Sequence, residues 1–244
     1  MRIDCEMHIG KHDGDVYNWV GGNVSAPQLQ ALMDEYQLDR CILLAPTAEY
    51  ADNKGLAAAA KDYPRMVPVA LVNPNGPGGG VPELERAVGE WGMKGLKLHP
   101  QRHAYDADGK APIRLMEACE RLGLTVSVHS GDKCCLPWQI GHLARKFPTV
   151  PVIMNHMGFR YYVDGAINVA LETPNIYLDT VLVSMPGYLR MAVDQVGAER
   201  VIYGSDYPVG HPASMIAAIK AANVGAAAEA LIMGDNLARI MKLA

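Results

Sequence analysis

Residues 124–156 read LTVSVHSGDKCCLPWQIGHLARKFPTVPVIMNH, and this stretch indicates the fold. It begins with a short apolar run rich in valine, Leu124–His129, and ends with another, Pro151–His156. The apolar residues between them recur at helical spacing until Pro148 stops the pattern; they are Leu136, Ile140, Leu143, Ala144 and Phe147. Two apolar strands joined by an amphipathic helix are typical of a parallel sheet covered by helices.

The same alternation continues over the whole chain. Ser25 can cap one of the intervening helices, and Gly123 can end another. Eight parallel strands are the number that closes a barrel. We therefore predict an α/β fold with a single (β/α)8 TIM barrel, followed by a C-terminal helical extension over Ala226–Leu243 that is broken at Gly234. The six other predicted strands are Met1–Cys5, Arg40–Ala45, Met66–Val72, Gly92–Leu98, Asn175–Thr180 and Arg200–Ser205.

The length agrees with this fold. The 244 residues give about 30 for each of eight units, enough for a strand, a helix and two short connections. No linker or charge run divides the chain, so we expect one domain over residues 1–244. A doubly wound open sheet has a similar alternation, but its phosphate-binding motifs GxGxxG and GxxxxGK[ST] are absent. Short connections also leave a pocket that is open to small substrates.

Composition excludes several classes of function. The chain has 22 Lys and Arg against 26 Asp and Glu, a formal charge of −4, and no basic cluster, so we expect no nucleic-acid partner. No run reaches the ~18 apolar residues of a membrane span, and the N-terminus lacks the apolar region of a signal peptide. We therefore expect a cytoplasmic protein without a membrane partner and with five reduced cysteines. A homodimer would be compatible with the sequence.

Residues that commonly bind metals stand at the ends of four predicted strands. Glu6 and His8 follow the first strand and, being two residues apart on an extended segment, point to the same face. His129, His156 and Asp206 stand at the ends of the fifth, sixth and eighth strands. The carboxyl ends of the strands form the catalytic face of a TIM barrel. Because imidazole and carboxylate groups suit zinc, manganese and iron, this pattern predicts a metal site.

Five ordered motifs resemble those of the amidohydrolase superfamily. The closer resemblance is to its amidohydrolase-related branch (amidohydrolase 2), which contains metal-dependent hydrolases and non-oxidative decarboxylases. Many members begin with H-x-H, whereas this chain has Glu6 in the first position, as in the branch that contains the decarboxylases. The resemblance extends from Ile3 to the segment Gly234–Arg239. The motifs are Glu6-x-His8, GLKLHP at 95–100, VHSG at 128–131, NHMG at 155–158 and GSDYP at 204–208.

The resemblance implies an enzyme with one divalent metal ion. Zinc is the first choice and manganese or iron the alternatives. The implied metal ligands are Glu6, His8, His129 and Asp206, and the implied catalytic residues for proton transfer are His156 and Asp206.

Three basic residues on or just past the fourth strand are candidates for substrate binding. Lys97, His99 and Arg102 could bind a carboxylate on a small-molecule substrate. Lys97 has a second interpretation, as a cation with a structural role.

Two reactions and one inactive alternative are compatible with these residues. We favour hydrolysis of a small ester, lactone or amide, in which a metal lowers the pKa of a water toward ~7 and His156 or Asp206 moves the proton. The alternative is decarboxylation of a small carboxylic acid, with His156 delivering a proton to carbon. An inactive ligand-binding barrel is the third interpretation, and the complete set of candidate ligands argues against it.

Overall fold

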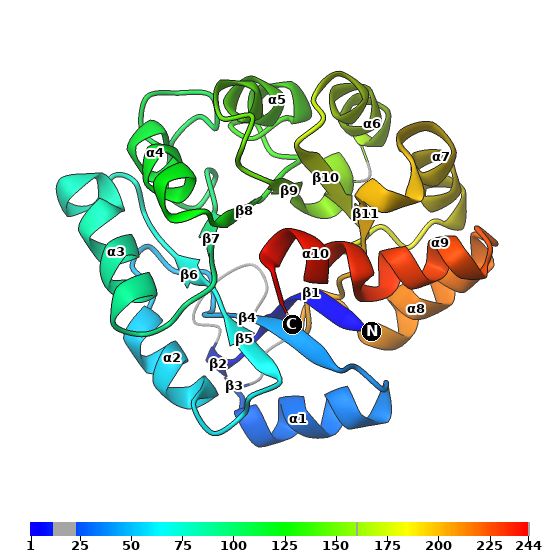
Figure 1. Cartoon of the computed structure of the whole chain (residues 1–244), viewed down its shortest axis with the longest axis horizontal. Coiled ribbons are helices and arrows are strands. Elements are labelled where there is room, and N and C mark those ends of the chain that lie inside the picture. Colours follow the sequence, from blue (N-terminus) through cyan, green and yellow to red (C-terminus); the bar gives the residue numbers. More distant parts are fainter. Residues whose placement is uncertain (12–22, 160, 244) are drawn as a thin grey trace.

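A computed structural model describes residues 1–11, 23–159 and 161–243, and its strands form a ring enclosed by helices (Figure 1). The separate strands β2 (Gly10–Lys11) and β3 (Asn23–Val24) pair antiparallel to each other. The ring consists of β1 (Ile3–His8), β4 (Arg40–Leu44), β5 (Met66–Pro68), β6 (Ala70–Leu71), β7 (Gly95–Leu98), β8 (Thr125–Val128), β9 (Val152–Met154), β10 (Ile176–Asp179) and β11 (Val201–Ile202).

Two joints close this ring into a barrel. The pairings within it are parallel and follow the orders β1-β4-β5 and β11-β10-β9-β8-β7-β6. At the first joint, β5 and β6 are separated by Val69 alone. At the second, Met7 of β1 forms a parallel bridge with Tyr207, just after β11. With β5 and β6 counted as one, eight parallel strands surround the barrel axis, and the predicted TIM barrel is confirmed.

The helices begin and end largely where the sequence indicated. Ser25 caps the first of them, where it accepts a hydrogen bond from Gln28 N, and Gly123 ends the fourth in a left-handed conformation. The helices are α1 (Ala26–Glu35), α2 (Asn53–Ala60), α3 (Val81–Gly89), α4 (Ile113–Leu122), α5 (Pro137–Lys146), α6 (Val163–Glu172), α7 (Pro186–Val196), α8 (Pro212–Ala221), α9 (Ala226–Ala230) and α10 (Asn236–Met241). Within the described residues, no helix is long and apolar enough to cross a membrane.

The C-terminal extension covers one end of the barrel. A π-helical turn, Leu231–Asp235, joins α9 to α10, so the predicted interruption at Gly234 is observed. Leu237 and Ile240 of α10 belong to the same apolar cluster as Ile3, near the beginning of β1. Thr125, the first residue of β8, donates its hydroxyl hydrogen to Ile240 O at 2.9 Å. Because these contacts involve the amino ends of strands, the carboxyl ends are left for a site (Figure 1).

Several predicted strand boundaries were wrong: Gly92–Leu98 is shortened to Gly95–Leu98 and Arg200–Ser205 to Val201–Ile202, and Met66–Val72 is divided at Val69. Two further corrections change the direction of side chains in the site. The first strand is Ile3–His8 and not Met1–Cys5, so Glu6 and His8 lie within it. Its pairing with β4 shifts register between Asp4 and Met7. The sixth strand ends at Met154, and Asn155–Gly158 forms a 3-10 turn instead of continuing the strand. The side chains of Glu6 and His8, beside the register shift, and of His156, in the turn, therefore point in directions that a regular strand would not give them.

Candidate metal centre

Two neighbouring strands bring three potential metal ligands together. Glu6 and His8 belong to β1, and Asp206 follows β11. His8 Nε2 lies 3.1 Å from Asp206 Oδ1 and 3.7 Å from Glu6 Oε1. All three residues are buried, and one ligand atom of each lies within 4.8 Å of the other two. Two carboxylates and an imidazole thus share one small volume at the carboxyl end of the barrel.

The backbone fixes the orientation of His8. Its Nδ1 lies 2.9 Å from the carbonyl oxygen of Ala45, so Nδ1 carries the hydrogen that is donated and Nε2 faces the two carboxylates. A metal-binding histidine usually has this arrangement, with one nitrogen hydrogen-bonded and the other directed at the ion. Burial alone would lower the pKa of His8, but its hydrogen bonds to Asp206 and Glu6 and their charges raise it to about 10. In the metal-free protein, His8 is therefore protonated at pH 7, and its positive charge lies beside the two carboxylates.

The backbone also holds Asp206 in an unusual conformation. Its φ is +58°, a left-handed value that costs energy for a residue with a side chain. Its N–H donates to Glu6 O at 2.8 Å, and the preceding N–H, of Ser205, donates to Asp4 Oδ1 at 2.9 Å. These bonds join the end of β11 to β1, so the carboxylate of Asp206 is held beside His8.

Lys97 pairs with Glu6 inside the barrel. Lys97 Nζ lies 2.5 Å from Glu6 Oε1 and 2.7 Å from Asn155 Oδ1, and the whole side chain is buried. Burial raises the pKa of Glu6, but the charge of Lys97 and the hydrogen bond to His8 hold it well below its usual range. These contacts suit a structural role for Lys97 better than a role in binding the substrate.

The remaining carboxylate oxygen of Glu6 tests whether a metal fits here. Glu6 Oε2 is buried and has no hydrogen-bond partner among the described residues. A buried carboxylate oxygen without a partner is costly, and a cation would remove that cost. Imidazole nitrogen and carboxylate oxygen are donors that suit zinc, manganese and iron. Glu6, His8 and Asp206 therefore fit a divalent metal with three protein ligands.

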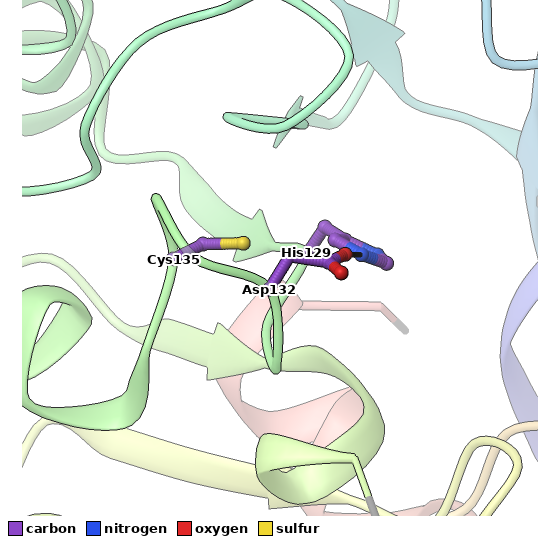
Figure 2. A group of neighbouring side chains, drawn as sticks. All are labelled: His129, Asp132 and Cys135. Carbon is purple, nitrogen blue, oxygen red and sulfur yellow. Dashed lines mark hydrogen bonds and ion pairs between the residues drawn. The ribbon is translucent and has the colours of Figure 1, made fainter.

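His129 lies outside this group of three ligands. Its Nε2 is 2.7 Å from Asp132 Oδ2, and its Nδ1 is 2.9 Å from His156 Nε2. The ring of His99 stacks on that of His129, with centroids 4.0 Å apart and planes 13° apart. Figure 2 shows His129 beside Asp132, with Cys135 nearby. Since both ring nitrogens contact other residues, the role of His129 as a ligand of the same metal as Glu6 stays a prediction.

His156 is a second buried imidazole, besides that of His8. It lies in the 3-10 turn after β9 with a left-handed φ of +61°, and its backbone N–H donates to Asp179 Oδ1 at 2.7 Å. Its Nδ1 has no hydrogen-bond partner among the described residues. Burial, followed by the charge of His129, lowers the pKa of His156 well below its usual range. The ring is therefore neutral at pH 7.

The other two predicted substrate-binding residues lie next to these imidazoles. His99 follows β7, is half-buried, and accepts a hydrogen bond from Arg102 N at 3.3 Å. Burial and then the charge of His129 hold the pKa of His99 well below its usual range. Arg102 is half-buried in the loop that follows. Their contacts with a substrate stay a prediction.

Sequence reasoning missed several residues that position the site. Asp179 ends β10 and accepts hydrogen bonds from the side-chain amide of Asn155 and from the backbone of His156. Asn155 in turn accepts from Lys97. A buried Asp at the end of an apolar strand was the available signal for Asp179, and Asn155 stood within a quoted motif. Asp132 follows the motif VHSG directly and could have been noticed for that reason.

A family model described as amidohydrolase matches residues 3–243. The chain belongs to this amidohydrolase family. Its members are metal-dependent enzymes and include both hydrolases and decarboxylases, as the sequence motifs implied. The amidohydrolase match therefore agrees with the divalent-metal site inferred from Glu6, His8 and Asp206.

Solved structures share the fold over their full length. An uncharacterized TIM-barrel protein from Bordetella bronchiseptica has a TM-score of 0.81 at 17% identity, with 98% of each chain covered. A dihydroxybenzoic acid decarboxylase from Polaromonas sp. JS666, with bound manganese and the inhibitor 2-nitroresorcinol, has a TM-score of 0.78 at 18% identity, covering 99% of this chain and 97% of that one. A candidate 2-pyrone-4,6-dicarboxylic acid hydrolase from Pseudomonas putida has a TM-score of 0.76 at 17% identity, with the same coverage. At these identities the likeness concerns the fold.

Proposed function

We propose that this amidohydrolase is a metal-dependent hydrolase of a small ester, lactone or amide that carries a carboxylate. The observation that carries the proposal is the buried His156, which lies 2.9 Å from His129 Nδ1 and whose pKa burial and the charge of His129 hold well below its usual range, so that the ring is neutral. A neutral imidazole can take a proton from an attacking water, whereas a general acid must hold a proton before the reaction begins. The first step of hydrolysis needs a base that accepts the proton of water, and a neutral imidazole can be that base.

The metal and the surrounding residues would have different roles in the reaction. Glu6, His8 and Asp206 would hold the metal, which supplies Lewis-acid polarisation of the substrate and lowers the pKa of a water. His156 accepts the proton of the attacking water at Nδ1 and returns it to the leaving oxygen or nitrogen. Lys97 keeps Glu6 ionised and in place through the 2.5 Å contact. Zinc is our first choice of metal, and manganese, which the Polaromonas decarboxylase binds, is the second.

The substrate carboxylate would face the half-buried side of the site. His99 and Arg102 lie together after β7, and His99 stacks on His129, which contacts His156. We assign the recognition of the carboxylate to Arg102 and His99, because Lys97 is already paired with Glu6. The candidate hydrolase from Pseudomonas putida is named for a dicarboxylic acid of a pyrone, which is a cyclic ester, and this supports the same substrate class.

Decarboxylation is the second candidate reaction. Glu6 in the E-x-H motif favours it, as does the similarity to the Polaromonas decarboxylase. The length of the chain does not separate the two reactions, because the chain covers 97% of that decarboxylase and 97% of the candidate hydrolase from Pseudomonas putida. In this reaction a protonated group must deliver hydrogen to carbon, and His156, neutral in the metal-free protein, would have to be charged first.

One screen separates the two reactions. Small lactones, esters, amides and carboxylic acids are offered to the metal-loaded protein while acid release and CO₂ release are measured side by side. We expect hydrolysis without CO₂, and the loss of about 10²–10⁴-fold in kcat for His156→Asn, which removes the proton acceptor. Sustained CO₂ release from a carboxylic acid, without hydrolysis of any ester, lactone or amide, would reverse the order of the two candidates.

A further inference from the structure

We propose that His103 is a positioning residue for substrate binding, because it ties the loop that carries His99 and Arg102 to two neighbouring loops at the carboxyl end of the barrel. The three loops follow β7, β4 and β6 and comprise residues 99–112, 45–52 and 72–80. This role rests on the proposed function in one respect, that Arg102 and His99 recognise the substrate carboxylate. Both candidate reactions act on a substrate with a carboxylate, so the role of His103 applies to either.

His103 belongs to the same turn as the two residues that it positions. Its backbone N–H donates to His99 O at 3.0 Å, and Arg102 N donates to His99 Nδ1 at 3.3 Å. These bonds hold His99, Arg102 and His103 together directly after β7. A shift of His103 would therefore move the other two residues with it.

The side chain of His103 binds the loop that follows β4. His103 Nε2 lies 2.9 Å from Ala48 O, and a carbonyl oxygen can only accept, so Nε2 carries the hydrogen. The residue is only 3% exposed, and burial lowers its pKa, so the ring is neutral at pH 7. Nδ1 then carries no hydrogen, and it has no hydrogen-bond partner among the described residues. The bond to Ala48 is thus the polar contact that fixes this ring.

The backbone of His103 binds the loop that follows β6. Asn75 Nδ2 donates to His103 O at 2.6 Å, and Asn75 N donates to Asn73 Oδ1 at 2.9 Å. Asn73 Nδ2 in turn donates to Glu49 O at 3.3 Å, in the loop that also contains Ala48. Hydrogen bonds therefore join each of the three loops to the other two, and His103 contacts both of its neighbours.

The glycine-rich stretch Asn73–Gly80 gives the loop after β6 the shape that this contact needs. Its last three residues, Gly78–Gly80, all have a left-handed φ, between +66° and +75°. A Cβ at Gly80 would lie 2.6 Å from Val72 Cγ1 and 2.9 Å from Asn73 O. The loop thus folds back on its own beginning, which is possible with glycine and holds Asn73 in place.

A loosened loop after β7 should weaken substrate binding more than it slows the chemical step. His99 and Arg102 lie in this loop, whereas His156 follows β9 and the candidate metal ligands lie on or beside β1 and β11. A long side chain that is free before binding must lose rotamer freedom when it binds, which lowers affinity. An interaction that holds the substrate and the transition state equally changes KM and leaves kcat unchanged.

Two amide variants separate the two nitrogens of the ring. In His103→Gln the amide nitrogen takes the place of Nε2 and can still donate to Ala48 O. In His103→Asn the shorter side chain takes the place of Nδ1 and does not reach Ala48. His142→Asn, on a side chain that is 53% exposed, controls for the change from imidazole to amide.

Calorimetric titration of the metal-loaded chain with succinate and with benzoate measures carboxylate binding without turnover. We expect His103→Gln and His142→Asn to bind like the wild type, and His103→Asn to bind about 3- to 10-fold more weakly. Equal affinities of wild type and His103→Asn would overturn the proposal, as would equal losses in His103→Asn and His103→Gln. Binding of neither carboxylate by the wild type would also overturn it, because Arg102 and His99 would then not recognise a carboxylate.

Asn75→Ala tests the same connection from the other loop. Asn75 is exposed, so the variant should fold even if His103→Asn does not, and it should also raise the Kd for the carboxylates. An unchanged Kd in Asn75→Ala together with an unfolded His103→Asn would contradict the positioning role.

Kinetics with a substrate from the screen separate this role from the proposed function. In His103→Asn, KM should rise about as much as the Kd while kcat stays near the wild-type value, and a fall in kcat at unchanged KM would contradict the role of His103. Release of CO₂ in place of hydrolysis would contradict the proposed function and leave the expected change in KM as it is.

Discussion

At the scale of single residues, the pair formed by Lys97 and Glu6 controls the charge of the metal centre. Both side chains are buried, and their charged atoms are 2.5 Å apart. Breaking a buried ion pair by removing one partner costs more than the pair contributes, because the other charge stays buried without compensation. The stability of the metal-free protein should therefore be sensitive to Lys97.

Lys97→Met should lower the free energy of unfolding of the metal-free protein by about 3–5 kcal/mol. The reason is that the Glu6 carboxylate loses its cation while it remains buried. Urea denaturation measures the difference, with Lys61→Met at an exposed position as the control. An equal loss of stability in the two variants would show that the buried pair has no special importance.

Asp4 should make stability depend on pH. Burial raises the pKa of Asp4 from 3.8 to about 6, so the folded protein binds the proton more tightly than the unfolded chain. Its contribution is therefore greatest below pH 4 and is lost as the pH rises to about 6, by about 3 kcal/mol in total. Asp4→Asn should remove this part of the pH dependence in urea titrations from pH 4 to 7. If the free energy of unfolding of Asp4→Asn depended on pH as strongly as that of the wild type, this role of Asp4 would be contradicted.

Single residues were predictable where the chemistry of the side chain was itself the signal. Glu6, His8 and Asp206 could be singled out from the sequence because metal-binding groups rarely gather near the ends of apolar runs by chance. The neighbours of His129 could not be found in this way. Its contacts with Asp132 and His156 depend on the rotamer of one ring, which no motif specifies.

At the scale of elements, a shift of register within β1 sets the direction of the side chains in the site. The register of β1 shifts between Asp4 and Met7, so Cys5 and Glu6 both face the barrel interior although they are consecutive. A regular strand would place one of them on the opposite face. Alternation in the sequence predicts the strand, but it does not predict a shift of one residue within it.

The turn after β8 depends on Gly131. A Cβ there would lie 2.5 Å from Phe159 Cβ, and φ is +97°. Gly225 is a matched control, since its φ is +90° and nothing lies within 4 Å of its Cβ position. Gly131→Ala should destabilise the protein by about 1 kcal/mol more than Gly225→Ala, because both share the backbone strain and only the first adds a clash. Equal melting temperatures of the two variants would refute the steric argument.

At the scale of the whole molecule, one end of the barrel contributes to stability and the other end carries the candidate metal centre. Contacts of α10 involve the amino ends of strands, while the candidate metal centre lies at the carboxyl ends. The eight-strand barrel was predictable because eight apolar runs recur along the chain. The covering of the barrel by α10 was not, since an amphipathic terminal helix can pack on several surfaces.

Leu237→Ala should separate stability from activity. Leu237 is fully buried under the barrel, so its truncation should cost about 2–5 kcal/mol in urea denaturation. Turnover below the unfolding transition should stay near the wild-type value, because the residue is remote from the site. Leu171→Ala, at a residue that is 47% exposed, is the control and should cost much less. A large loss of turnover in folded Leu237→Ala would contradict the division of tasks.

The central claim, a metal held by Glu6, His8 and Asp206 that turnover requires, is tested most directly by metal removal and return. The protein is stripped with a chelator, its residual metal is measured by elemental analysis, and hydrolysis is assayed before and after one equivalent of Zn²⁺ or Mn²⁺ is added. We predict no turnover without metal, recovery in the wild type, and no recovery in a folded Asp206→Asn variant. Full hydrolytic activity in protein shown to be free of metal would contradict the account.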